Sequence, residues 1–256
     1  MLDRSVADTA AKITLADNAY RSIRDRILSG EFPLGQPLSR RKLAGQLGMS
    51  FVPVSEALQR LERERLVESR ARSGTRVCIP SSEEVRGYYI LREALESQAA
   101  RLFAERATIR QKSELARLAR QVDKRFSAPP LVKMDRQKHL FETHRLHFEF
   151  HMRIAEFTRC RELVQALETN QVLIFHWLYN SAAHFDTVPP DWHQTLIDAL
   201  CSGDPDQAER AMRHHVRFRA DEVAARIGAY LVADRNDRHA FRGAREPAPS
   251  RRRRSL

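Results

Sequence analysis

The sequence predicts a mainly α-helical protein, in which a small winged helix-turn-helix precedes an antiparallel bundle of about six helices. Three observations support this fold class. Short amphipathic segments separated by glycines open the chain, and a stretch of alternating apolar and polar residues follows them. From residue 83 onwards no strand pattern occurs, and short connections containing Pro or Gly separate helical stretches. The apolar share of 42% is enough for a buried core in a chain of 256 residues.

The first helix is expected over residues 16–29. Ala19, Ile23 and Ile27 recur there at the spacing that places them on one helical face. Gly30 follows directly, and a glycine at this position is a common helix stop signal.

Two shorter helices are expected in SRRKLAGQLG and SFVPVSEALQRLERERL, with Gly48 between them and Ser50 suited to cap the second. This order is typical of a helix-turn-helix, whose second helix enters the major groove of DNA. The next stretch, LVESRARSGTRVCIP, alternates on both sides of Gly74 and predicts a two-stranded wing. Pro80 marks the expected domain boundary.

The rest of the chain predicts six helices with short connections, which is typical of an antiparallel bundle. They are expected over residues 83–106, 108–126, 133–158, 160–182, 189–202 and 204–229. The whole chain then divides into a flexible N-terminus (1–15), a DNA-binding domain (16–79), a linker (80–82), a helical effector and metal-binding domain (83–230) and a basic, disordered tail (231–256).

The positive charge is concentrated at the two ends of the chain. Residues 1–80 carry 14 Lys and Arg against 9 Asp and Glu, and residues 235–256 carry 8 against 2, whereas the middle is balanced. A basic end favours a polyanion such as double-stranded DNA. No run approaches the ~18 apolar residues of a membrane-spanning helix, so we expect a cytoplasmic protein without a membrane partner. The three cysteines lack C-x-x-C spacing and do not suggest a thiolate metal site.

Histidines are the candidate metal ligands. His147 and His151 are four residues apart and share a helical face. His193 lies eleven residues before the turn at Asp204 and His215 eleven residues after it, so an antiparallel hairpin sets them side by side. Four such imidazoles would suit zinc, with nickel, iron or manganese as alternatives. Two histidines on one helix are also common as packed structure, and His144, three residues before His147, could join the site or support it.

The segment LSRRKLAGQLGMSFVPVSEALQRL and the wing residues RSGTRV resemble the GntR family of bacterial transcription regulators. The resemblance implies that Arg41, Ser50 and Gly74 contact DNA and that Pro53 sets the start of the recognition helix. Phe51 and Ser55 stand where the family commonly has arginines, so Phe51 could contact a thymine methyl and Ser55 a phosphate or a base. The remaining candidates for phosphate contacts are Arg40, Lys42, Arg60, Arg72 and Arg76.

The stretches LREALESQAARLFAERA, FHMRIAEFTRCRELVQAL and WHQTLIDALCSGDPDQAERAMRHHV resemble the FCD ligand-binding domain of the FadR subgroup of that family. In the metal-binding members of this subgroup an Asp precedes the first His ligand by four positions. Here the first His ligand corresponds to His151, and His147 stands in place of the Asp. Four neutral histidines and a divalent ion then carry a net charge of +2. The resemblance implies that Arg92 clamps an effector carboxylate, with a salt bridge to Glu96 as the alternative. Further candidates for the cavity wall are Tyr89, Asn170, His176 and Asn180.

Together these features predict a homodimeric, ligand-responsive regulator that binds a near-palindromic operator. We expect a repressor that a small carboxylate releases by binding at the metal and Arg92. Two alternatives stay open. The first is a metalloenzyme that activates water, although Glu149 points off the histidine face and no general base is evident. The second is a helical module whose histidines bind no metal.

Overall fold

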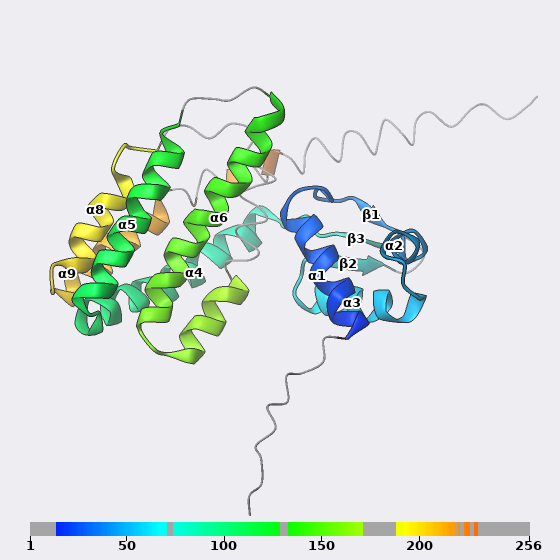
Figure 1. Cartoon of the computed structure of the whole chain (residues 1–256), viewed down its shortest axis with the longest axis horizontal. Coiled ribbons are helices and arrows are strands. Elements are labelled where there is room, and N and C mark those ends of the chain that lie inside the picture. Colours follow the sequence, from blue (N-terminus) through cyan, green and yellow to red (C-terminus); the bar gives the residue numbers. More distant parts are fainter. Residues whose placement is uncertain are drawn as a thin grey trace, which may run out of the picture.

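A computed structural model describes residues 14–70, 74–128, 133–170, 188–218, 220, 223–225 and 228–229. A small N-terminal head of helices and strands stands beside a larger bundle of helices (Figure 1). The expected flexible N-terminus, apart from residues 14 and 15, and the expected disordered tail lie outside the described residues. No helix within the described ranges is both long enough and apolar enough to cross a membrane.

Three helices form the head, and each begins where the sequence offers a start signal. Thr14 caps the first helix in a reciprocal capping box with Asp17. Ser39 caps the second helix, and Gly48 ends it in the left-handed conformation that glycine adopts at little cost. Ala19, Ile23 and Ile27 are buried, as their spacing predicts. The helices are α1 (Leu15–Leu28), α2 (Arg40–Leu47) and α3 (Phe51–Arg63).

The wing is a three-stranded antiparallel sheet, whereas the sequence predicted two strands. The additional strand is β1 (Pro37–Leu38), which pairs with β3 (Gly74–Val77), while β3 pairs on its other edge with β2 (Val67–Arg70). A strand of two residues is too short to show alternation, and Pro37 speaks against a strand except at a sheet edge, which is where β1 lies. The prediction of a two-stranded wing was therefore wrong by one edge strand.

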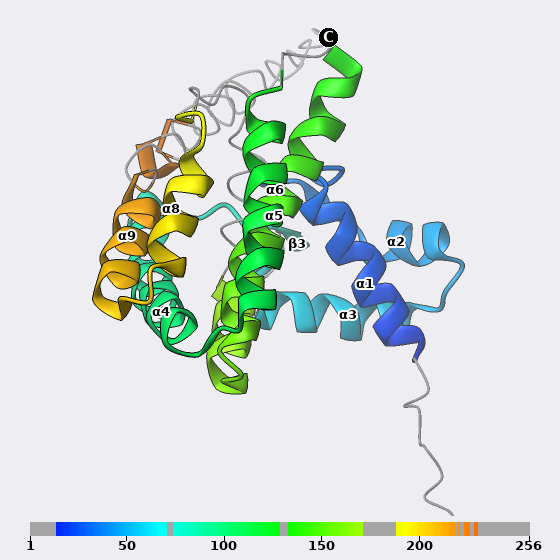
Figure 2. The same cartoon turned by 60° about the vertical axis from the view of Figure 1, so that its left-hand side comes forward.

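The helical domain contains the predicted antiparallel helices. The long helix α4 contacts α6, α8 and α9, and α5 lies against α6 and α8. In Figure 2 α8 and α9 stand together above α4 at the left of the bundle, and α5 and α6 stand to their right. The apolar core includes Phe103, Phe150, Ile154, Leu200 and Met212, all almost fully buried. The helices are α4 (Ser82–Arg106), α5 (Ile109–Phe126), α6 (Lys133–Phe157), α8 (Trp192–Cys201) and α9 (Pro205–Arg217).

Two helix boundaries differ from the expectation. The helix predicted over 189–202 starts only at Trp192, because two prolines and the left-handed Asp191 (φ 60°) precede it. The helix predicted over 204–229 ends as α9 at Arg217, although helical residues recur at 220, 223–225 and 228–229. The helix predicted over 160–182 is present at 161–170, and its second half lies outside the described residues.

Candidate metal centre and DNA-binding surface

Four histidines from three helices meet in the core of the bundle. His147 and His151 lie one turn apart on α6, His193 is the second residue of α8, and His215 lies in the last turn of α9. One ring nitrogen of each lies within 4.8 Å of those of the other three. The structure thus brings together the histidines that helical spacing and the hairpin had paired.

Short distances join the rings. The Nε2 atom of His151 lies 2.9 Å from Nε2 of His147 and 3.3 Å from Nε2 of His215. The ring centroids of His193 and His215 are 5.0 Å apart, which confirms that the two arms of the α8–α9 hairpin place them side by side. Trp192 stacks on His215 with centroids 4.1 Å apart and covers this side of the cluster.

Two buried carboxylates hold the outer nitrogens of two of these rings. Glu96 on α4 contacts Nδ1 of His151, and Nδ1–H of His193 donates to Oδ1 of Asp123 on α5 at 2.6 Å. These contacts direct the Nε2 atoms of both rings towards the cluster and raise the basicity of the imidazoles. Glu96 was expected only as a partner of Arg92, and no role was expected for Asp123. Neither belongs to a motif with the histidines.

Burial favours the neutral form of three of the imidazoles. It lowers the pKa of His147 and of His215 well below the ordinary value, and neighbouring imidazoles lower both further. Burial also lowers the pKa of His151 and outweighs the opposing effect of Glu96. For Glu96 itself burial acts to raise the pKa, but Arg92 and His151 outweigh it and bring the value to about 2. A neutral imidazole is the form that binds metal, so this cluster is prepared for an ion.

The donor set fits a divalent transition metal. Nitrogens that lie about 2.1 Å from one ion are about 3 to 4.2 Å from one another, depending on the number and arrangement of the ligands. The observed separations of 2.9 Å and 3.3 Å are close to this range, and the limit of 4.8 Å exceeds it only slightly. Imidazole donors alone suit zinc, nickel, copper or iron.

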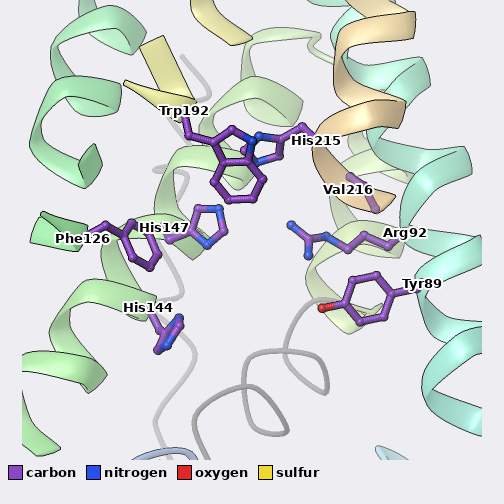
Figure 3. A pocket seen from close by; sticks show the side chains of 8 residues that line it. All are labelled: Tyr89, Arg92, Phe126, His144, His147, Trp192, His215 and Val216. Atoms are coloured by element: carbon purple, nitrogen blue, oxygen red, sulfur yellow. The ribbon is translucent and has the colours of Figure 1, made fainter. Parts of the chain in front are cut away.

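Arg92 extends from α4 to the same cluster. Its Nε–H donates to Glu96 Oε1 at 2.5 Å, and its Nη2 lies 3.3 Å from Nε2 of His151. The salt bridge with Glu96, expected as the alternative role of Arg92, is present and buried. The Arg92 guanidinium points towards the histidines (Figure 3). The cavity between them has a volume of about 20 Å³, which is room for about one water molecule. Its wall consists of Tyr89, Arg92, Phe126, His144, His147, Trp192, His215 and Val216.

The charges around the cluster favour an anion once a metal is bound. The expected charge of +2 counted only the ligands and the ion. Glu96 and Asp123 each bring a negative charge into contact with a ligand ring, and Arg92 brings a positive one. With a divalent ion the whole group carries a net charge of +1, which an anionic ligand would neutralise.

Other residues expected at this site have different positions. His144 lines the cavity but does not belong to the group of close donor nitrogens. Tyr89 lines the cavity as expected. Asn170 is buried but donates to the backbone oxygen of Tyr88 at 3.3 Å and does not line the cavity, so its expected effector role is not supported. His176 and Asn180 lie outside the described residues.

In the head, the start of α2 and the wing enclose a concave surface of about 490 Å³. Arg40, Arg41 and Gly74, three of the residues expected to contact DNA, line it. Lys42 on α2 is exposed, as are Ser50 and Phe51 at the start of α3, where Phe51 is 53% exposed. These residues are accessible to a DNA duplex.

Several other residues that were expected to contact DNA are buried or paired within the head. Pro53 is buried in the first turn of α3, and the hydroxyl oxygen of Ser55 is buried without a hydrogen-bond partner among the described residues, so neither is presented to DNA. The guanidinium of Arg60 lies over the Tyr20 ring at 3.7 Å and faces Asp17 and Glu64. Arg76 pairs with Glu68 on the neighbouring strand at 2.5 Å, and Arg72 lies outside the described residues.

Family models match both parts of the chain. The family described as "Bacterial regulatory proteins, gntR family" matches residues 15–77, and the FCD domain matches residues 88–218. Among solved structures, E. coli McbR/YncC has a TM-score of 0.66 at 19% identity, covering 86% of this chain and 100% of that one. A GntR regulator from Rhodococcus sp. RHA1 reaches 0.68 at 19% identity, covering 82% and 97%. These structures share the fold.

Curated relatives agree with the domain matches. A probable D-xylose utilization operon transcriptional repressor of Paenarthrobacter nicotinovorans is 30% identical over 207 residues, which is 80% of this chain and 87% of that protein. The repressor RspR of Escherichia coli K12 is 26% identical over 80% of this chain and 86% of its own length. Because the two family models match most of the chain and a regulator with 30% identity covers 80% of it, the chain belongs to the GntR family of transcription regulators, with an N-terminal gntR domain and a C-terminal FCD domain.

Proposed function

We propose that the protein is a ligand-responsive repressor whose effector is a small carboxylate bound at a histidine-coordinated divalent metal, of which zinc fits best. The observation that carries the proposal is the convergence of four imidazoles beside the Arg92 guanidinium. When bound, the metal would supply a Lewis-acidic site for one carboxylate oxygen. Arg92 would hold the other oxygen by charge-assisted hydrogen bonds.

A continuous helix links this site to the DNA-binding head. Helix α4 carries Tyr89, Arg92 and Glu96, and it begins at Ser82, a few residues after the last wing strand. Arg65 of the head also faces Glu84 of the same helix at 3.9 Å. An effector that repositions Arg92 would therefore act on the helix that leads into the head. Such an effector changes DNA affinity only if it favours one arrangement of the heads.

The protein would act in the cytoplasm as a homodimer, with two heads on the half-sites of a near-palindromic operator. Repression relieved by the effector is supported by the names of two relatives, both of which are described as repressors. The concave basic surface at Arg40 and Arg41 supports binding to the DNA backbone.

Replacing His151 with Ala tests the proposal. The variant should lose bound zinc and the response to carboxylates, while the metal-free protein should keep its affinity for the DNA upstream of its own gene. His214→Ala is the matched control, because His214 is exposed and adjacent to the ligand His215. Metal content is measured by elemental analysis, and DNA binding by fluorescence anisotropy. Stoichiometric zinc on His151→Ala would refute the proposed site, and absence of zinc on the wild type would show that the histidines are structural.

A further inference from the structure

Helix α8 begins without a side-chain cap of its own. Its N-cap residue, Asp191, adopts a left-handed conformation and makes no side-chain hydrogen bond to the first turn. In contrast, the N-cap side chains of α1, α2, α4, α5 and α9 each accept a hydrogen bond from the first turn of their helix. An N-terminus left without such a partner makes the helix less stable.

The missing cap is supplied by another helix. Asp123, in the last turns of α5, accepts from the backbone N–H of His193 at 3.1 Å and from that of Gln194 at 3.0 Å. These are the donors that an N-cap side chain would otherwise satisfy. The carboxylate of Asp123 is 8% exposed, so water does not compete strongly for it.

The same carboxylate holds the side chain of His193. Its Oδ1 accepts from Nδ1–H of this ring at 2.6 Å, in addition to the backbone N–H of the same residue. One oxygen thus fixes both the backbone and the ring of His193, and the ring is left with only Nε2 for a metal. The geometry of the ligand and the first turn of α8 therefore depend on one side chain.

We propose that Asp123 is a positioning residue that joins metal binding at His193 and the first turn of α8 into one cooperative unit. The inference rests on the proposed metal site. A bound ion pulls on Nε2 of His193, and because Nδ1 and the backbone N–H are held by Asp123, the ion stabilises the start of α8. Trp192, which precedes His193 and stacks on His215, carries the same restraint to α9.

Full-length Asp123→Asn and Asp123→Ala variants test this role. The first is isosteric and is expected to fold even if the second does not. Zinc affinity, measured by competition with a chromophoric chelator, should fall by about 10- to 100-fold, the usual effect of removing a partner of a metal-bound histidine. The visible spectrum of the cobalt(II) form should also change, because the His193 ring is no longer oriented. A merely structural residue would not change that spectrum.

Asp204→Ala is the matched control. Asp204 caps the other helix of the hairpin through hydrogen bonds of 2.9 Å and 3.1 Å but does not touch a histidine. It should destabilise the metal-free protein as a lost cap does, yet leave zinc affinity within about threefold. Equal zinc affinity in Asp123→Asn and wild type would overturn the positioning role while the metal site stood. Absence of zinc binding in the wild type would instead remove the metal site itself.

Hydrogen exchange tests the coupling to α8. Zinc should slow exchange of the His193 and Gln194 amides in the wild type, and this protection should be much smaller in Asp123→Asn. If zinc binds the wild type without slowing exchange at the start of α8, the cooperative unit does not exist.

Discussion

The carboxylate of Glu96 is expected to dominate the stability of the metal-free effector site. It is 1% exposed, it accepts from Arg92, and it contacts His151. Replacing it with Gln keeps the shape but removes the charge, which leaves the Arg92 guanidinium buried without its counterion. We therefore expect Glu96→Gln to destabilise the helical domain at neutral pH.

The magnitude follows from the pKa. A carboxyl whose pKa is about 2 in the folded protein, against an ordinary 4.5, contributes about 3 kcal/mol to folding at neutral pH. Removal of one partner from a buried ion pair typically costs a similar 3–5 kcal/mol, on the order of what is expected here. Because the folded pKa is depressed, this contribution is fully present above pH 4.5 and is lost as the pH falls towards 2.

Urea unfolding of the metal-free protein is the assay. Both tryptophans, Trp177 and Trp192, lie in the C-terminal part of the chain, so their fluorescence reports on the helical domain. Glu149→Gln is the control, since Glu149 is more exposed and faces Arg153 at 3.8 Å, a pair expected to contribute about 0.5 kcal/mol or less. The reasoning is refuted if Glu96→Gln unfolds within about 0.5 kcal/mol of the wild type at pH 7, or if their difference does not shrink below pH 4.5.

Two further predictions concern the histidines and the DNA surface. Burial lowers the folded pKa of His147 and His215, so the unfolded chain takes up protons first on acidification. The contribution of these imidazoles to the stability of the metal-free protein should be complete above about pH 6.5 and should be lost as the pH falls below that value. A urea midpoint that does not fall on acidification below about pH 6.5 would contradict neutral buried imidazoles. Arg41→Ala should weaken DNA binding and reduce the slope of log affinity against log salt by about 0.9, as for one lost phosphate contact. Arg110→Ala, an exposed arginine of the bundle, is its control, and an unchanged slope for Arg41→Ala would exclude a phosphate contact.

Local sequence signals predicted the helices well but not the wing. Thr14, Ser39, Ser81, Thr108 and Asp204 each begin a helix and cap it with their own side chain. Ser50, the cap expected from the sequence, is the N-cap residue of α3 but makes no side-chain hydrogen bond to its first turn. Strand β1 was not visible, because two residues cannot show alternation and their pairing with β3 joins segments more than thirty residues apart.

The histidine cluster could be predicted because helical geometry converts spacing into position. An interval of four residues sets His147 and His151 on one face, and equal distances from the hairpin turn set His193 beside His215. Their supporting carboxylates could not be found in this way, since Asp123 is 70 residues from His193 and no periodicity relates the two. The burial of the Ser55 hydroxyl could not be predicted for a similar reason, because only packing decides it.

The sequence alone thus determined most of the helices and the four candidate ligands, because periodicity and hairpin symmetry act over a few residues or along one helix. The tertiary structure alone decided that Glu96 and Asp123 orient two of the rings, that Arg92 reaches the cluster, and that α5 supplies the cap of α8. These features depend on which helix faces contact one another in the bundle, and that choice is made by the packing of the whole core.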